Sequence, residues 1–158
     1  MRQYTIEQIE KEKVIAIIRG ADADQCMKVA EALYEGGIRL MEITYNQKAP
    51  ESFRTTAATI GALVKEFEGR MLIGAGTVTT EELVDLTADA GGRFIISPDC
   101  YPEVIRRTRE RNMVSIPGAL TPTEIMNGMN CWRALPRSAL IRLSERLSRV
   151  ILRRFRRK

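Results

Sequence analysis

The 158-residue chain contains no histidine and only three cysteines. Without imidazole, acid–base chemistry near neutral pH has to use a carboxylate, lysine, tyrosine, cysteine or bound water, with a pKa set by the site. The cysteines, Cys26, Cys100 and Cys131, are odd in number and lack the spacing of metal ligands. We therefore expect no metal centre and a reducing, cytoplasmic location.

Long apolar runs are missing as well. No stretch approaches the roughly 18 apolar residues of a membrane span, and the opening segment MRQYTIEQIEKEK has no apolar signal core. The hydrophobic fraction of 44% and the charged fraction of 28% are ordinary for a globular protein. These totals predict one domain, with or without a tail, and no membrane span.

Negative charge is scarce in only one part of the chain. Residues 1–130 hold 15 Lys and Arg against 19 Asp and Glu, a net charge of −4, whereas residues 131–158 hold 10 against 1, a net charge of +9. The body, residues 1–130, therefore gives no electrostatic reason to expect nucleic acid as a partner. We treat residues 131–158 as a separate basic tail.

Five short apolar runs, each followed by a segment with helical spacing, make up the body. The runs cover residues 14–19, 38–44, 71–78, 93–98 and 113–120. The first suits a strand buried on both faces, and its helix has an aspartate in the cap region and ends at Gly36 and Gly37. Five strand–helix units favour an α/β fold with a parallel sheet. The repeat averages about 25 residues and eight units would need about 200, so we expect a partial (β/α)8 TIM barrel of about five units.

Functional groups in parallel α/β folds lie at the carboxyl ends of the strands. Here those ends offer Arg19, Glu42, Thr44, Thr77 and Pro98. Glu42 is the most informative, because LMEIT places a carboxylate inside an apolar strand, and a buried acid is costly unless it is hydrogen-bonded or functional. Two interpretations stay open: a general acid/base whose pKa is raised by burial, or a structural ion pair with Arg19 across neighbouring strands.

The GAGTV segment, residues 74–78, ends its strand with small residues. Glycines there allow a ligand to approach the backbone closely, and Thr77 together with the start of the next helix could bind an anion. The alternative is an ordinary strand–helix turn, because glycines alone are a weak signal.

Five motifs occur together in an order and spacing that match one enzyme family. They are KVIAIIRG, EGGIRLMEIT, IGAGTV, FIISPD and IPGALTPTEI, spread over residues 10 to about 128. In these motifs the chain resembles the 2-keto-3-deoxy-6-phosphogluconate (KDPG) and 4-hydroxy-2-oxoglutarate (KHG) aldolases. The resemblance implies a (β/α)8 barrel, usually a homotrimer, that needs no metal or other cofactor and cleaves a small-molecule 2-keto acid to give pyruvate.

The resemblance also implies roles for the residues at the strand ends. Glu42 resembles the acid that transfers protons, through water, to and from the substrate hydroxyl and C3. Arg19 and Thr77 resemble groups that hold the pyruvate carboxylate, and Pro98 resembles a residue that lines the same pocket. Thr44, beside them, is a further candidate for substrate binding.

Two features depart from the family pattern. The family has a lysine, in a motif like Lys-Leu-Phe-Pro-Ala, that forms an imine with the keto carbon of pyruvate. Counting about sixteen residues beyond Thr121 without gaps reaches Arg137 at that position. A guanidinium keeps its proton and is a poor nucleophile. In addition, Asn46 replaces an arginine that often follows Glu-x-Thr, which leaves the second substrate open. We expect a family member without lyase turnover, because the lysine and strands six to eight are absent from this sequence.

The basic tail has two competing explanations. Arg, Leu and Ser make up 17 of its 28 residues, and each has six codons, so out-of-frame translation or a truncated remainder would produce such a segment. Alternatively, its leucines and arginines form an amphipathic helix for nucleic acid or an anionic membrane, making the chain a non-catalytic binding module. Five strands without barrel closure would also leave two apolar sheet edges, so we expect the isolated chain to aggregate or to form a molten oligomer.

Overall fold

The computed structural model describes residues 1–131 as one parallel sheet covered by helices. The strands are β1 (Ala16–Ile18), β2 (Leu40–Thr44), β3 (Leu72–Gly76), β4 (Phe94–Ser97) and β5 (Val114–Pro117). The helices are α1 (Arg2–Glu12), α2 (Ala23–Glu35), the 3-10 turn η1 (Pro50–Ser52), α3 (Phe53–Glu66), α4 (Glu81–Asp89), α5 (Pro102–Glu110) and α6 (Pro122–Cys131). The basic tail lies outside the described residues except for Cys131, so the division at residue 130 stays a prediction.

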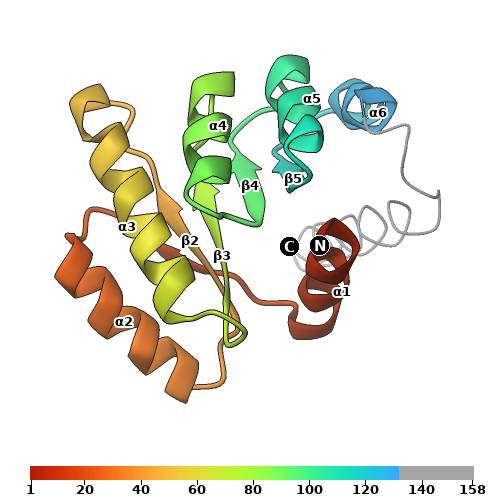
Figure 1. Ribbon diagram of the computed structural model, residues 1–158. Helices are drawn as coiled ribbons and strands as arrows, with labels where there is room; N and C mark the ends of the chain where they lie inside the picture. The colour runs from red at the N-terminus through yellow and green to blue at the C-terminus, as the bar shows by residue number, and fades with distance from the viewer. Residues whose placement is uncertain (132–158) are drawn as a thin grey trace, which may run out of the picture.

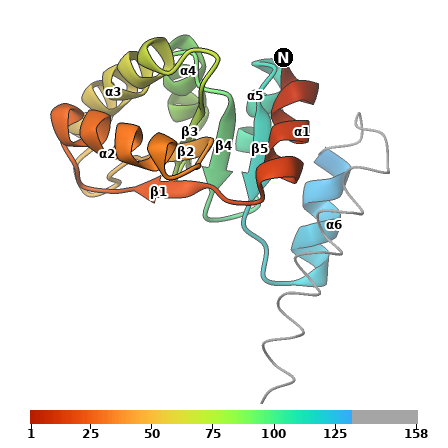
Figure 2. The same ribbon diagram turned by 90° about the horizontal axis from the view of Figure 1, so that it is seen from below.

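The strands lie in the order in which they occur along the chain, β1-β2-β3-β4-β5, and all pairs are parallel. Helices α2 to α5 follow the sheet in the same order (Figures 1 and 2). Chain-order strands with a helix between each pair are the arrangement of a (β/α) barrel. The predicted α/β fold of about five units is therefore confirmed, with strand ends zero to three residues inside the predicted runs.

The second helix begins and ends at the residues that the sequence indicated. The Asp22 side chain accepts a hydrogen bond from the Gln25 backbone at 2.8 Å, and the Gln25 side chain accepts one from the Asp22 backbone at 3.2 Å. This reciprocal cap satisfies two amide groups that the first turn leaves free. The helix ends at Glu35, and Gly37 follows with a φ of 90°, which glycine adopts without steric cost.

The apolar residues of the sheet divide between its two faces. Met41, Ile43, Ile73, Ala75 and Ile95 belong to the core beneath helices α2 to α5. The alternate positions point the other way, toward the inside of the barrel, because side chains alternate along a strand. On that inner face Leu40, Phe94 and Val114 form a second cluster.

Helix α1 covers part of this inner cluster and was missed in the sequence analysis. Its Ile6 and Ile9 pack against the cluster that contains Leu40 and Phe94. Most of the remaining side chains of α1 are charged or polar, so its amphipathic pattern is weak. Only tertiary contact shows that these two isoleucines are part of the core.

The expectation that the first strand is buried on both faces was wrong for Ile17. Its side chain is 62% exposed, although Ile17 lies opposite Glu42 in the neighbouring strand. The reason is its position in the sheet: β1 is an edge strand among residues 1–131, so β2 is its only strand neighbour there.

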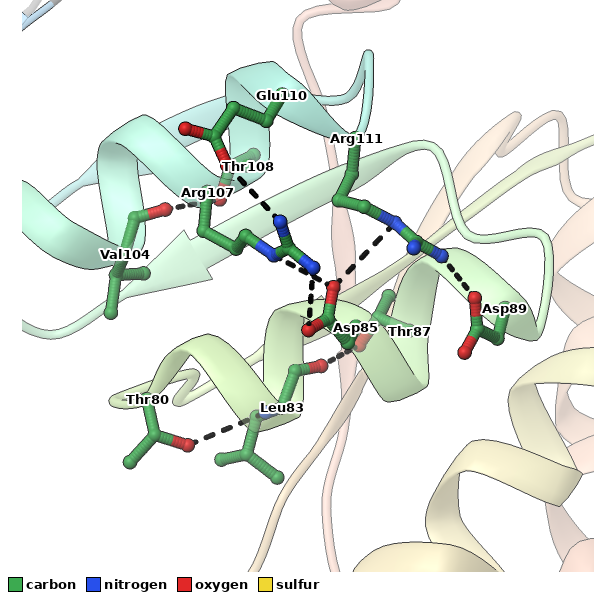
Figure 3. A network of polar contacts seen from close by, with 10 residues as sticks. All are labelled: Thr80, Leu83, Asp85, Thr87, Asp89, Val104, Arg107, Thr108, Glu110 and Arg111. Atoms are coloured by element: carbon green, nitrogen blue, oxygen red, sulfur yellow. Dashed lines mark hydrogen bonds and ion pairs between the residues drawn. The ribbon is translucent and has the colours of Figure 1, made fainter.

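An ion-pair network joins the neighbouring helices α4 and α5 (Figure 3). The Arg107 guanidinium donates to both carboxylate oxygens of Asp85, at 2.9 and 3.0 Å, and also to Glu110 at 3.1 Å. Arg111 lies 3.6 Å from Asp85 and pairs with Asp89. The hydrogen bonds that Arg107 donates to Asp85 and Glu110 raise its pKa further. The two-pronged contact fixes the relative orientation of the two helices.

Candidate active site

Four of the five predicted site residues lie at one edge of the sheet. Ile18 is the register partner of Ile43, so Arg19, the residue after β1, lies next to Thr44 at the end of β2. Thr44 is itself paired with Gly76, and Thr77 follows directly. Pro98 comes immediately after β4. The parallel sheet therefore brings these residues together although they are spread over most of the body.

Glu42 lies one pleat deeper, on the inner face of the sheet. Its side chain is 4% exposed and stands between the register positions of Ile17 and Gly74. The oxygen Oε2 is buried and has no hydrogen-bond partner among the described residues. Burial raises the pKa of the Glu42 carboxyl to about 7, against the smaller lowering effect of the Arg19 charge. Near neutral pH this carboxyl can therefore both accept and donate a proton.

The structural ion pair between Glu42 and Arg19 is not formed. None of the ion pairs within residues 1–131 joins the two side chains, and Arg19 is exposed. The ion-pair interpretation of the buried acid therefore lacks its contact, and the acid/base interpretation stays a prediction. The absence of a fixed partner leaves the carboxyl free for a ligand or a water molecule.

The two glycines of GAGTV serve a purpose that the sequence did not reveal. A Cβ on Gly76 would lie 2.3 Å from Oε1 of Glu42, and a Cβ on Gly74 would lie 2.4 Å from the ring of Phe94. Neither approach is compatible with van der Waals packing. The glycines thus make room inside the barrel for the Glu42 carboxyl and for a core aromatic ring, rather than only for a ligand.

Replacing Gly76 with alanine is expected to lower stability by about 1–3 kcal/mol, because the new methyl group must displace the buried carboxyl of Glu42. The matched control is Gly61→Ala in α3, where the nearest atom to the new Cβ is 3.7 Å away. That change should be stabilising by roughly 0.5–1 kcal/mol through helix propensity. Urea unfolding measures both. Equal effects of the two substitutions would contradict the proposed packing role of Gly76.

Thr77 has a strained backbone that is held by a neighbouring loop. Its φ is 56°, which is an outlier for a β-branched residue and costs of order 1–3 kcal/mol. Gln47 Nε2 donates to the Thr77 carbonyl at 2.8 Å, and Thr79 Oγ1 donates to Gln47 Oε1 at 3.0 Å. Gln47 therefore ties the loop after β2 to the loop after β3. Sequence reasoning missed Gln47, because no local pattern distinguishes it from any exposed loop residue.

The remaining polar groups at this edge are positioned by the core. Thr44 is buried, and its Oγ1 has no partner among the described residues. Tyr45, the next residue, is also buried and makes a 3.1 Å hydrogen bond with Thr87 of α4. Thr80 caps the same helix by accepting from the Leu83 backbone at 3.3 Å. This anchoring fixes the end of β2 and leaves the Thr44 hydroxyl available.

Comparison with known proteins identifies the family to which this arrangement belongs. A sequence model described as "KDPG and KHG aldolase" matches residues 5–134. The chain belongs to the KDPG and KHG aldolase family. The resemblance drawn from the five motifs is therefore confirmed. In this aldolase-family chain the motifs lie on the strands and strand ends described above.

Individual relatives agree with this placement. The chain is 42% identical over 113 residues to "Probable 2-dehydro-3-deoxy-6-phosphogalactonate aldolase" of Rhizobium meliloti, covering 72% of this chain and 50% of the relative. It is 34% identical over 116 residues to 2-dehydro-3-deoxy-6-phosphogalactonate aldolase of Escherichia coli, covering 73% and 54%. The aldolase-family chain thus spans about half the length of the curated relatives that it matches.

A solved structure supports the same conclusion for the fold. KDPG aldolase from Legionella pneumophila, solved with pyruvate captured as a covalent carbinolamine intermediate, superimposes with a TM-score of 0.64 at 30% identity. The alignment covers 74% of this chain and 53% of that one.

Within residues 1–131, no three acidic or cysteine side chains gather in a way that could hold a metal ion. In the same part of the chain, every helix is too short or too polar to cross a membrane.

Proposed function

We propose that the carboxyl edge of the sheet binds the pyruvate part of a 2-keto acid and that Glu42 is the proton-transferring group. The observation that carries this proposal is the buried carboxyl of Glu42, whose Oε2 has no hydrogen-bond partner among residues 1–131 and whose pKa burial raises to about 7. The exposed guanidinium of Arg19 and the hydroxyls of Thr44 and Thr77 surround the same edge and suit a carboxylate. Pro98 would line the pocket on the side of β4.

The family reaction defines what Glu42 would do. Cleavage of a 4-hydroxy-2-keto acid breaks the C3–C4 bond while the C4 hydroxyl loses its proton and becomes an aldehyde. The electron pair of the broken bond moves toward C2, and C3 later regains a proton to complete pyruvate. A carboxyl that titrates near neutral pH can accept the first proton and return it in the second step, directly or through water.

We propose further that this polypeptide does not complete the reaction on its own. The electron pair needs a sink at C2, which the family provides as a lysine imine. The lysines of this chain are Lys11, Lys13, Lys28, Lys48, Lys65 and Lys158. None lies near position 137, where the family places its amine and which is outside the described residues. Chemistry at C2 is therefore the missing part, while the acid/base part is retained.

The names of the relatives support a proposal for the substrate class. The first two are named for 2-dehydro-3-deoxy-6-phosphogalactonate, and Asn46 stands where the family often has an arginine. We propose that the family substrate in this lineage is a 2-keto-3-deoxy sugar acid 6-phosphate, with the galactonate epimer preferred. We propose a cytoplasmic location, in keeping with free Cys26 and Cys100, and assembly as a homotrimer, as in the intact family.

Pyruvate binding tests the proposed site without requiring turnover. In an NMR titration, the full chain should bind pyruvate reversibly, and Thr77→Val should weaken binding roughly tenfold by removing a hydrogen bond to a charged group. Thr55→Val, on the exposed surface of α3, is the matched control and should leave binding unchanged. No detectable pyruvate binding, or an equal loss of affinity in the two variants, would contradict the proposed site.

The charge division of the chain favours one second candidate, in which the basic tail makes the chain a binding module for nucleic acid or anionic membrane. Filter binding of RNA or DNA across a salt series tests it. Several phosphate contacts would give a steep fall of log affinity with log salt, and removal of residues 132–158 would abolish binding. A flat salt dependence would eliminate the nucleic-acid form of this candidate, and the absence of binding to anionic vesicles would eliminate the membrane form.

A further inference from the structure

A cavity of about 460 Å³ lies at the amino-terminal ends of the strands, at the opposite end of the sheet from the candidate active site. Its lining comes from α1, from the loops that lead into β2 and β4, and from the connection between α3 and β3. Helix α1 and the connections that lead into β2 and β3 appear in the lower half of Figure 1. The volume is that of an ordinary small-molecule pocket.

Two arginines that line this cavity stand before two strands, β2 and β4, which lie on either side of β3. Arg39 immediately precedes β2 and Arg93 immediately precedes β4. The Arg39 carbonyl accepts from Leu72, and the Arg93 amide donates to Ile73, so both residues flank the start of β3. Two strand spacings separate them, about 10 Å between backbones. Both side chains can therefore reach one small ligand placed between them.

The Arg39 guanidinium is already held in place. Its Nη1 donates to the carbonyls of Tyr34 and Ile38, at 2.8 and 2.9 Å, and the group lies 4.3 Å from the centre of the Tyr34 ring. Neither contact neutralises the charge, and the other nitrogens remain able to donate. A guanidinium fixed in this way loses little entropy when it binds an anion.

The acidic side chains nearby do not neutralise these arginines. Glu12 lines the cavity but pairs with Lys11 at 3.2 Å, and Glu68 lines it without pairing to Arg39 or Arg93. Within residues 1–131, neither arginine forms an ion pair with a carboxylate. The third arginine of the lining, Arg70, is by contrast paired with Glu31 at 3.7 Å and Glu66 at 3.2 Å. Positive charge is therefore concentrated on Arg39 and Arg93.

We propose that this cavity is a second binding site, for a small anion that bears a phosphate group. A terminal phosphate presents three acceptor oxygens pointing in different directions, and can therefore accept from Arg39 and Arg93 at once. Lys11, whose side chain is 71% exposed, would have to exchange its contact with Glu12 for the third oxygen. A planar carboxylate has only two oxygens and matches fewer of these donors. The site is separate from the Glu42 edge, so the proposal does not depend on the proposed function.

Titration of the full chain with inorganic pyrophosphate, followed by calorimetry at low, fixed ionic strength, tests this site. Arg93→Gln is expected to weaken binding roughly tenfold or more, because it removes charge-assisted hydrogen bonds. Arg93→Lys keeps the positive charge but removes the planar pair of guanidinium donors, so its loss of affinity should be intermediate. The Arg93 side chain makes no hydrogen bond or ion pair within residues 1–131, so both Arg93 variants should fold. Lys11→Gln, at an exposed position, is a further variant that is expected to weaken binding.

The matched control is Arg106→Gln on α5, an exposed arginine that pairs with Glu103 and lies outside the cavity lining; it should change affinity less than roughly twofold. Hydrogen exchange should show protection of residues 34–39, 68–73 and 91–93. The proposal is overturned by any of four results: no heat of binding, protection confined to residues 77–82, an equal loss in Arg106→Gln, or succinate binding as tightly as pyrophosphate.

Discussion

Incubation of the 158-residue chain with pyruvate and sodium borohydride is expected to leave its mass unchanged, and neither family substrate is expected to release pyruvate. The reason is the missing electron sink. Without a lysine amine at the position where the family has it, pyruvate cannot form the imine that makes C3 acidic and accepts the electron pair of the broken bond. Proton transfer by Glu42 cannot compensate, because general acid–base catalysis typically contributes only about 10²–10⁴-fold.

The alternative lysines are poorly placed. Lys65 lies at the end of α3, and Lys48 lies in the exposed turn after β2, where its backbone amide donates to Asn46. Intact-mass spectrometry after reduction and a coupled assay for pyruvate provide the two readings. KDPG aldolase of Legionella pneumophila, in which pyruvate has been captured covalently, is the positive control. A stoichiometric adduct on Lys48, or any turnover that Glu42→Gln abolishes, would show that the chain is active.

The stability of the protein is expected to fall as the pH rises from about 4.5 to about 7. The Glu42 carboxyl has an ordinary pKa of 4.5 and a pKa of about 7 in the folded protein. Between these values the folded state holds a proton that the unfolded state has released, so stability is lost with rising pH. The full shift corresponds to about 3 kcal/mol. Above pH 7 the ionised carboxyl is buried, and its Oε2 has no hydrogen-bond partner among the described residues.

Glu42→Gln should remove this dependence, since the amide keeps the shape of the carboxyl without its charge. The variant should be more stable than the wild type at pH 8, by up to about 3 kcal/mol, and nearly equal to it at pH 4. Urea unfolding at several pH values measures the difference. Glu35→Gln, on the exposed end of α2, is the control and should follow the wild-type curve. Parallel curves for the wild type and Glu42→Gln would mean that Glu42 is ionised normally.

The elements that sequence reasoning located are those whose cause is local. Short β-branched runs, the Asp22 cap and the Gly36–Gly37 ending depend on neighbouring residues only. The parallel order of the strands then followed from repetition, because consecutive strand–helix units have few ways to pack. The position of Glu42 on a buried strand was predictable for the same reason.

The features that it missed depend on contacts between distant segments. Helix α1 has a core face only because Ile6 and Ile9 pack against a cluster whose buried residues come from β2, β4, β5 and α5. Gln47 gains its role from a carbonyl 30 positions away, and Ile17 is exposed because of its place at the sheet edge. The positive φ of Thr77 is likewise a product of the loops that hold it. None of these four features can be predicted from a short window of sequence.

The close approach of Gly76 to the Glu42 carboxyl also bears on how this protein can evolve. A side chain at position 76 would occupy the volume that the carboxyl now fills, so the two positions should accept changes only as a pair. In a library randomised at both sites, survivors with alanine or serine at 76 should carry a shorter residue at 42. Stepwise mutation would rarely produce these double variants. Enlarging residue 76 first would crowd the Glu42 carboxyl, and shortening residue 42 first would leave a cavity. The contact with Gly76 therefore restricts which substitutions Glu42 can accept during evolution.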